Sequence, residues 1–172
     1  AYRPGTGEEL WRVRSTTQWV TPTPVIGPDR VISVSGRNGP IMAIRPGGKG
    51  DVESKNIYWR HFQDGAYIPS PVSYRNRLFV LGDNGRLDCY NIGDGTRIWR
   101  IEPGRGSCTG SLVAGAGRLY YADERGTVYV VAADDEGEVL ARNQFRERCL
   151  TTPAIVGDRI YLRTESKLYC IE

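Results

Sequence analysis

Residues 89–99, Cys89-Tyr90-Asn91-Ile92-Gly93-Asp94-Gly95-Thr96-Arg97-Ile98-Trp99, decide the fold of this chain. The stretch joins an apolar strand-forming segment, a glycine-containing turn and a second segment that ends in tryptophan. Related stretches begin at Ala1 and Ala43 and end at Trp11 and Trp59. The recurrence indicates that one supersecondary unit is repeated along the chain.

The spacing of a second landmark gives the period of the repeat. A Ser/Thr residue followed by Pro or Leu opens four aligned segments, and the second residue of each pair is Pro24, Pro71, Leu112 or Pro153. The steps are 47, 41 and 41 residues. A period near 41 is typical of propeller blades. The sequence therefore predicts an all-β fold, a β-propeller of four blade repeats of about 41 residues with four antiparallel strands each.

Each unit shows the alternation of strand and turn that antiparallel hairpins require. Gly and Asx residues mark the turns. At one equivalent position of the repeat, the fourth strands carry a large residue, namely Trp11, Trp59, Trp99 and Leu140. The stretch 138–148 has helical propensity, but the repeat phase predicts a strand in its first half. The second strands are expected at 31–34, 78–81, 119–121 and 160–162, and the third strands at 41–44, 87–90, 128–131 and 168–171.

The same phase divides residues 1–172, taken as a single propeller segment. Residues 1–20 are expected to be the outer strand of a preceding or closing blade, and 21–66, 67–107 and 108–148 one blade each. Residues 149–172 are an incomplete blade. Two arrangements stay open: a closed four-bladed ring in which the strand of Trp11 completes the last blade, or half of a larger disc. The second arrangement is favoured, with further blades supplied by the same or a second chain. In an open arc of four blades, the apolar surfaces at which blades pack would otherwise be exposed to water.

Composition agrees with many short elements rather than long helices. The 172 residues include 21 Gly and 10 Pro, and the 23 basic and 20 acidic residues give a net charge of +3. No apolar run approaches a membrane span, and no signal peptide is recognised within the chain. The basic residues are scattered, so a nucleic-acid partner is not expected.

The stretch 89–99 resembles the tryptophan-docking motif of quinoprotein-like (PQQ-type) β-propellers, Ala-x-Asp-x-x-Thr-Gly-x-x-x-Trp. Asn91, Gly95 and Trp99 hold the Asp, Gly and Trp positions, and Cys89 replaces the small Ala. The resemblance implies that Trp11, Trp59 and Trp99 are structural docking residues, and that half of an eight-bladed disc is the expected architecture.

The motif departs from this pattern in two of the units. Residues 43–59 contain six inserted residues, and in the third unit Val130 and Leu140 stand at the ends with Gly137 one place late. The glycine is expected to permit a sharp turn and the indole to pack across a blade junction.

The resembling family contains non-enzymes of the BamB type, which assist outer-membrane protein assembly, and quinone-dependent dehydrogenases. The resemblance implies an extracytoplasmic or periplasmic scaffold that contacts a protein or ligand. The alternative is a fragment of a dehydrogenase that binds PQQ and calcium. The dehydrogenases hold the quinone with carboxylate and amide ligands to calcium and often a vicinal disulfide, whereas no two cysteines are adjacent here. We therefore expect no catalytic, cofactor-binding or metal-ligating set, and regard an enzyme as the less favoured reading.

The remaining reactive side chains also favour structural roles. His61, the single histidine, is expected at a surface or sheet edge. Cys89 and Cys170 share the phase of Ala43 and are expected to be small buried residues. Cys108 and Cys149 are 41 residues apart, which leaves two readings, a disulfide if their Cα atoms approach within about 7 Å or two free thiols.

Four arginines share one phase just before the second strands, namely Arg30, Arg77, Arg118 and Arg159. Repetition about an axis predicts a ring of these side chains on one face of the disc. Ordinary turn chemistry explains them, and an electropositive rim for an acidic partner or polyanion is the alternative.

Overall fold

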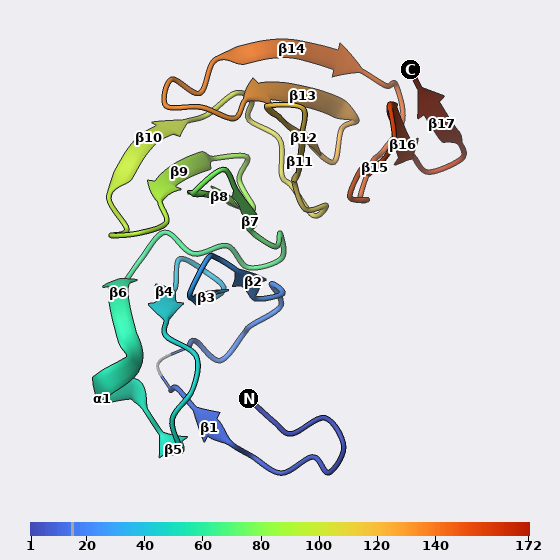
Figure 1. The fold of residues 1–172 in the computed structure, drawn as a ribbon. Coiled ribbons are helices and arrows are strands. Elements are labelled where there is room, and N and C mark those ends of the chain that lie inside the picture. The colour runs from blue at the N-terminus through green and yellow to red at the C-terminus, as the bar shows by residue number, and fades with distance from the viewer. Residues whose placement is uncertain (15) are drawn as a thin grey trace.

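The structure is a computed structural model that describes residues 1–14 and 16–172. Antiparallel sheets follow one another along an open arc, and the two termini lie at opposite ends of it (Figure 1). Three sheets have four strands and the last has three. The propeller architecture and the blade count predicted from the repeat are confirmed.

The sheets are built in chain order, with each strand beside the next. The first sheet contains β2 (Val25–Ile26), β3 (Val31–Val34), β4 (Ile41–Ile44) and β6 (Ile57–His61); the second β7 (Val72–Tyr74), β8 (Arg77–Leu81), β9 (Leu87–Asn91) and β10 (Arg97–Ile101); the third β11 (Val113–Gly115), β12 (Arg118–Ala122), β13 (Thr127–Ala132) and β14 (Val139–Gln144); the fourth β15 (Ala154–Val156), β16 (Arg159–Arg163) and β17 (Leu168–Ile171).

The segments outside these sheets lie at the N-terminal end of the arc. β1 (Trp11–Arg12) pairs in parallel with β5 (Gly50–Asp51). The strand of Trp11 therefore does not lie beside β17, and the closed four-bladed ring is not formed. The six inserted residues between Ala43 and Trp59 accommodate β5 and the short helix α1 (Glu53–Asn56), an element that the all-β prediction missed.

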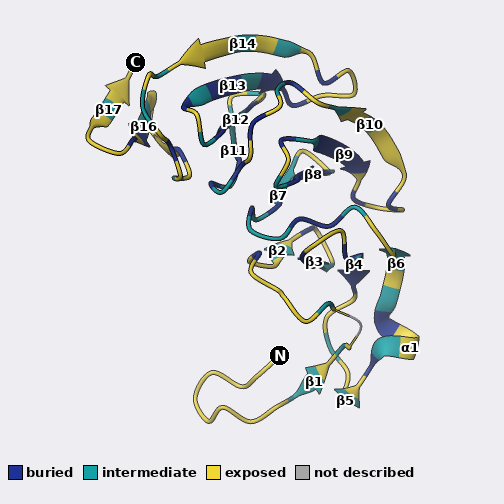
Figure 2. Ribbon diagram, turned by 180° about the vertical axis from the view of Figure 1, so that it is seen from behind, coloured by how far each residue is buried: buried dark blue, intermediate teal, exposed yellow. Residues whose placement is uncertain are grey.

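The core lies between neighbouring sheets. One cluster joins the first and second sheets and a larger one joins the second and third. The cluster between the third and fourth sheets is the smallest of the three, with Ala122, Val128, Cys149 and Leu162. Burial falls off toward both ends of the arc, where exposed residues dominate (Figure 2).

A ladder of hydroxyl groups links the segments that lead into the innermost strands. The backbone N–H of Thr23 donates to Oγ of Ser70, that of Ser70 to Oγ of Ser111, and that of Ser111 to Oγ1 of Thr152, each at 2.9 Å. These residues open the four repeats, so the Ser/Thr landmark of the sequence has a structural cause. Each blade uses one small hydroxyl to satisfy a backbone donor of the preceding blade.

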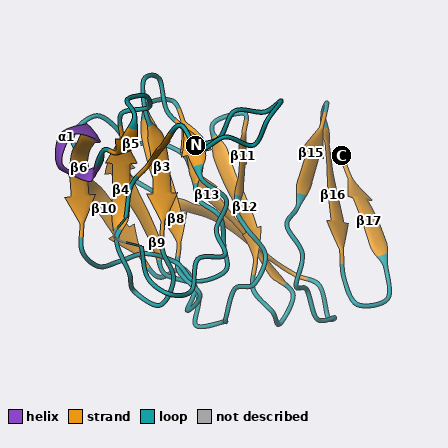
Figure 3. Ribbon diagram, turned by 90° about the horizontal axis from the view of Figure 1, so that it is seen from below, coloured by secondary structure: helices purple, strands orange, loops and turns teal. Residues whose placement is uncertain are grey.

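The antiparallel order puts two kinds of connection at opposite ends of the sheets (Figure 3). One end carries the turns from the first to the second strand and from the third to the fourth. The other end carries the turns from the second to the third strand together with the connections between sheets. The exposed side chains at these two ends are the candidates for contact with other molecules.

Candidate interaction surfaces

Two tryptophans contact the following sheet. The indole Nε1 of Trp59 donates to the carbonyl oxygen of Ile92 at 3.0 Å, and that of Trp99 to the carbonyl oxygen of Asp134 at 2.9 Å. A Cβ atom on Gly95 would lie 2.6 Å from the Trp59 ring, and one on Gly137 2.6 Å from the Trp99 ring. Both glycines have positive φ, so an L side chain is excluded there by conformation and by space.

Register corrects the expected docking position of the third sheet. Cys89 pairs with Trp99 and Ala43 with Trp59, whereas Val130 pairs with Ala141 and not with Leu140. The turn of the third sheet holds one extra residue, so Gly137 is one place late, as expected, and the tryptophan position has moved with it from Leu140 to Ala141. Leu140 faces outward and is 45% exposed.

Trp11 occupies a different setting from the other two docking tryptophans. It is half-buried, and its carbonyl oxygen accepts a hydrogen bond from the amino group of Ala1 at 2.7 Å. Its strand β1 pairs with the inserted segment β5. Docking of its indole on the turn of another sheet remains a prediction.

The four in-phase arginines recur at the starts of the second strands, but they do not form a ring of free charges. Arg30 pairs with Asp29 at 2.6 Å and also donates to the carbonyl oxygen of Gly93 in the next sheet, and Arg77 pairs with Asp135 at 2.6 Å. The bond to Asp135 raises the pKa of Arg77. The other two differ: Arg159 pairs with Glu172, and Arg118 has no ion pair with the described residues.

A buried ion cluster was not expected from the sequence. The carboxylate of Asp88 is 0% exposed and accepts two hydrogen bonds, from Nε–H of Arg86 at 2.7 Å and from Nε–H of Arg100 at 2.6 Å. Asp64 accepts a guanidinium nitrogen of Arg100 at 2.7 Å, and Arg86 and Arg97 lie farther away. Burial raises the pKa of Asp64, but the bond and charge of Arg100 outweigh it and the pKa is lowered. The cluster holds Asp64, in the connection between β6 and β7, against the second sheet.

The cysteines and the histidine have structural surroundings. All four cysteines are free thiols, so the disulfide between Cys108 and Cys149 is not formed. The Cys108 thiol donates to the carbonyl oxygen of Gly106, and the Cys149 thiol to that of Arg163. Burial raises the pKa of Cys108 to about 12. Cys89 is buried as predicted, whereas Cys170 is exposed because no fourth strand covers β17 in the described structure.

His61 is half-buried between the rings of Trp59 and Tyr90. Its Nε2 lies 2.7 Å from the carbonyl oxygen of Gly95, which can only accept, so Nε2–H is the donor. The imidazole therefore braces the first blade junction.

Residues 1–14 and 16–172 contain no group of three or more His, Cys, Asp or Glu side chains that could hold a metal ion. The acidic side chains near the blade junctions instead accept hydrogen bonds from turns and arginines, as Asp83 does from the backbone N–H groups of Tyr67 and Ile68. No chemical step through calcium or a quinone follows from this arrangement.

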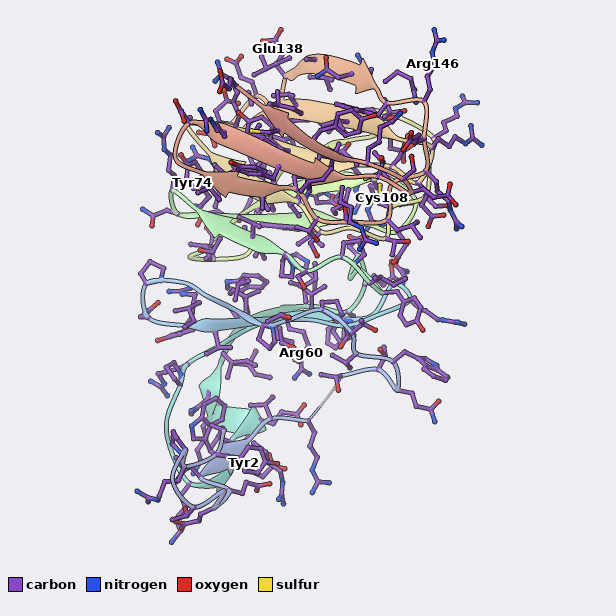
Figure 4. All side chains as sticks on the ribbon, turned by 90° about the vertical axis from the view of Figure 1, so that its right-hand side faces the viewer. Tyr2, Arg60, Tyr74, Cys108, Glu138 and Arg146 are labelled. Atoms are coloured by element: carbon purple, nitrogen blue, oxygen red, sulfur yellow. The ribbon has the colours of Figure 1, made fainter. Side chains whose placement is uncertain are left out.

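Exposed aromatic and arginine side chains gather at the end of the sheets that carries the inter-sheet connections. We call this the connector face. Backbone bonds hold its turns and connections together, as from Cys108 N to Asp83 O and from Glu124 N to Ser107 O, both 2.8 Å. Arg146 lies on this side and Tyr74 on the opposite one (Figure 4). The face is defined by Trp19, Arg37, Phe62, Arg105, Arg125 and Arg146.

The connector face carries charge that its surroundings leave unpaired. Arg37 lies over the rings of Trp19 and Tyr67, at 5.8 and 5.2 Å from the ring centroids, whereas Arg125 and Arg146 are exposed and form no ion pair with any described residue. Trp19 is 53% exposed. A signal for this face was present in the sequence, because Arg105 and Arg146 stand 41 residues apart, each three residues before Cys108 or Cys149.

Acid is expected to loosen the junction of the third and fourth sheets. Glu147 accepts hydrogen bonds from Lys167 at 2.7 Å and Thr164 at 2.6 Å, which lowers its pKa to about 2. Because the unfolded-state pKa of glutamate is about 4.3, this contribution to stability is complete above that pH and is lost as the pH falls toward 2. Urea unfolding measured from pH 7 to pH 2.5 should show a weaker pH dependence for Glu147→Gln. An equal dependence in both proteins would contradict the assignment.

The profile of a protein family described as "Outer membrane protein assembly factor BamB" matches residues 1–116 and 83–170 of this chain. A comparison with curated protein sequences returns no significant match.

Solved structures with the same fold share little sequence. BamB from Moraxella catarrhalis is 14% identical with a TM-score of 0.65, over 86% of this chain and 43% of that protein. The computationally designed Ika8 protein is 14% identical with a TM-score of 0.79, over 99% and 51%. A europium-containing methanol dehydrogenase is 10% identical with a TM-score of 0.56, over 73% and 24%. The chain thus spans about half of the BamB and Ika8 chains.

Proposed function

Because this chain belongs to the family of the outer membrane protein assembly factor BamB, we propose that it is a non-catalytic propeller scaffold whose connector face binds a protein partner in the assembly of outer-membrane proteins. The location that goes with this function is extracytoplasmic, in the periplasm. No helix in the described part of the chain is long and apolar enough to cross a membrane. The partner is an acidic polypeptide segment, since the face that receives it is basic.

The connector face is the observation that carries this proposal. Trp19 and Phe62 are 53% and 76% exposed, and the face also carries Arg37, Arg125 and Arg146, which form no ion pair with any described residue. Aromatic and arginine side chains are the types enriched at the centres of protein interfaces and among their hot spots. The in-phase ring on the opposite face supports a polyanion less well, because Arg30, Arg77 and Arg159 are already paired.

The dehydrogenase alternative makes a separate prediction. Titration of the protein with PQQ and Ca²⁺ is expected to give neither a thermal shift nor an absorbance change. Saturable binding would support the enzyme reading and contradict a purely structural role. The fold alone does not decide, because one fold hosts unrelated functions.

Complementation tests the scaffold function. The chain, secreted into the periplasm of a Gram-negative strain that lacks its own factor of this family, should restore the folded, heat-modifiable fraction of outer-membrane β-barrels. The double variant Trp19→Ala/Arg125→Glu should lose at least half of that restoration, because interface anchors of these types contribute about 2 kcal/mol or more each.

Ile98→Ala is the matched control for this experiment. Ile98 is an apolar residue, 36% exposed, on the outer strand β10 and away from the connector face, and its variant should restore assembly like the parent chain. Equal restoration by the double variant would place the binding surface elsewhere. No restoration by the parent chain at normal abundance would contradict the proposed function itself.

A further inference from the structure

A polar pocket lies at the end of the sheets opposite the connector face, among the first-to-second and third-to-fourth turns of the first three sheets (Figure 3). We call it the turn pocket. Its volume is about 450 Å³, within the range of roughly 300–1,000 Å³ that small-molecule sites occupy. Its polar side chains are Asp29, Arg30, Asn76, Arg77, Asn91 and Asp135. Two of these are in-phase arginines, so the repeat brings them to one site.

The two arginines hold the two carboxylates of the pocket in fixed positions. Nε–H of Arg30 donates to Asp29 at 2.6 Å, and the hydroxyl of Tyr58 donates to the other oxygen of Asp29 at 3.1 Å. Arg77 donates to both oxygens of Asp135, at 2.7 and 2.6 Å. The bonds from Arg30 and Arg77 lower the pKa of Asp29 and Asp135, so both remain ionised at neutral pH. Each carboxylate oxygen keeps a further lone pair for a ligand.

Two asparagine side chains add hydrogen-bonding groups that the protein does not use. Oδ1 of Asn91 accepts the backbone N–H of Gly93 at 2.8 Å, which leaves the Nδ2–H groups of Asn91 as donors. The exposed side chain of Asn76 forms no hydrogen bond with any described residue. The turn pocket therefore presents amide donors beside carboxylate acceptors.

The balance of charges in the pocket selects against most classes of ligand. The two carboxylates and the two guanidinium groups neutralise each other, so a charged ligand would lose its hydration without gaining a free ion-pair partner. An apolar ligand would remove water from the amide side chains and leave their polar atoms unsatisfied. A hydroxyl group both donates and accepts hydrogen bonds. A neutral molecule with several hydroxyl groups therefore matches this mixture of donors and acceptors.

Part of the pocket wall is apolar. Pro28 and Ile98 line it, and Ile98 is 36% exposed. The C–H groups on one face of a sugar ring can cover such side chains and remove their apolar surface from water.

We propose that the turn pocket binds a neutral saccharide, whose hydroxyl groups donate to Asp29 and Asp135 and accept from Asn76 and Asn91. The site lies at the opposite end of the sheets from the connector face and does not depend on the partner that binds there.

NMR titration of the ¹⁵N-labelled 172-residue chain tests the proposal. The neutral probes are methyl β-glucoside and N,N′-diacetylchitobiose, and at least one should shift the side-chain amide signals of Asn76 and Asn91 with a dissociation constant on the order of 1 mM, given the few atoms of the ligand. Glucuronate has a similar ring with one carboxylate. It should bind about fivefold more weakly than the glucoside or less, because its charge finds no free partner.

Asn91→Asp is the variant that isolates the amide donor. The new side chain keeps an oxygen for the N–H of Gly93 but has no Nδ2–H, so saccharide binding should weaken about fivefold, the effect of one hydrogen bond. Asn84→Asp is the matched control. Oδ1 of Asn84 accepts the N–H of Arg86, also two residues later, in a turn at the connector end, and this variant should bind as the parent chain does.

Four outcomes would overturn the proposal: no binding of either neutral probe at roughly ten times the expected constant, shifts confined to residues outside the turn pocket, glucuronate binding as tight as that of the glucoside, or equal losses in Asn91→Asp and Asn84→Asp. If Asn91→Asp does not fold, Asn76→Gly decides, because glycine adopts the φ of 60° found at Asn76 without strain. Its binding should weaken by a similar factor, and unchanged binding would contradict the site. Outer-membrane assembly is not the readout, so failure here leaves the scaffold function standing.

Discussion

Replacing Asp88 by alanine is expected to lower the free energy of unfolding by about 3–5 kcal/mol, because it removes the shared partner of two guanidinium groups from a buried site. Asp88 is 0% exposed and is bound by Arg86 and Arg100, whose side chains are 14% and 33% exposed. Because water cannot fully solvate the Arg86 guanidinium in place of the lost carboxylate, a positive charge remains partly unpaired in a low-dielectric environment.

Urea unfolding followed by circular dichroism measures this effect, with the slope of the transition as a check on two-state behaviour. Asp135→Ala is the control, because that carboxylate pairs with Arg77 but is 62% exposed, and exposed pairs contribute about 0–1 kcal/mol. Similar losses for the two variants would show that the ion cluster around Asp88 does not hold the second sheet.

Replacing Trp99 by alanine is expected to cost about 3–5 kcal/mol, the range for removing a large aromatic side chain from a packed junction. The indole contacts Gly137, donates to the carbonyl oxygen of Asp134 and packs beside Phe79. Trp99→Phe keeps an aromatic ring but loses the N–H donor, so its cost should be smaller and include about 1 kcal/mol for the hydrogen bond.

Ile98→Ala separates docking from loss of any apolar residue on the outer strand. Ile98 precedes Trp99 in β10 but faces outward, and its variant should change stability by no more than about 0.5 kcal/mol. The measurement is again the free energy of unfolding in urea. A Trp99→Ala variant as stable as Ile98→Ala would mean that the tryptophan motif does not hold the blades together.

The strands could be predicted from the sequence because each blade repeats the same local chemistry. The predicted third strand at 41–44 coincides with β4, and the predicted strand in the first half of 138–148 is β14. The repeat position predicted this strand correctly although the stretch has helical propensity, because pairing with β13 determines its conformation. The helix α1 escaped prediction because it lies in an insertion that has no counterpart in other repeats.

Side-chain roles were harder to predict where they depend on contacts between blades. One extra residue in the turn before Gly137 moved the docking position from Leu140 to Ala141, and only the pairing of Val130 reveals this. The buried state of Asp88 was also hidden, because an acidic residue at that position is compatible with an exposed strand face. Its partners Arg86 and Arg100 lie on either side of it in the chain but meet it only in the folded sheet.

The hydroxyl ladder has a consequence for the order in which the chain folds. Thr23, Ser70 and Ser111 each direct a backbone N–H to a hydroxyl that lies 47, 41 and 41 residues later. As the chain emerges from its N-terminal end into a new compartment, a blade therefore keeps an unsatisfied backbone donor until the next repeat has followed it. The most recently emerged blade is the one that a protease meets incomplete.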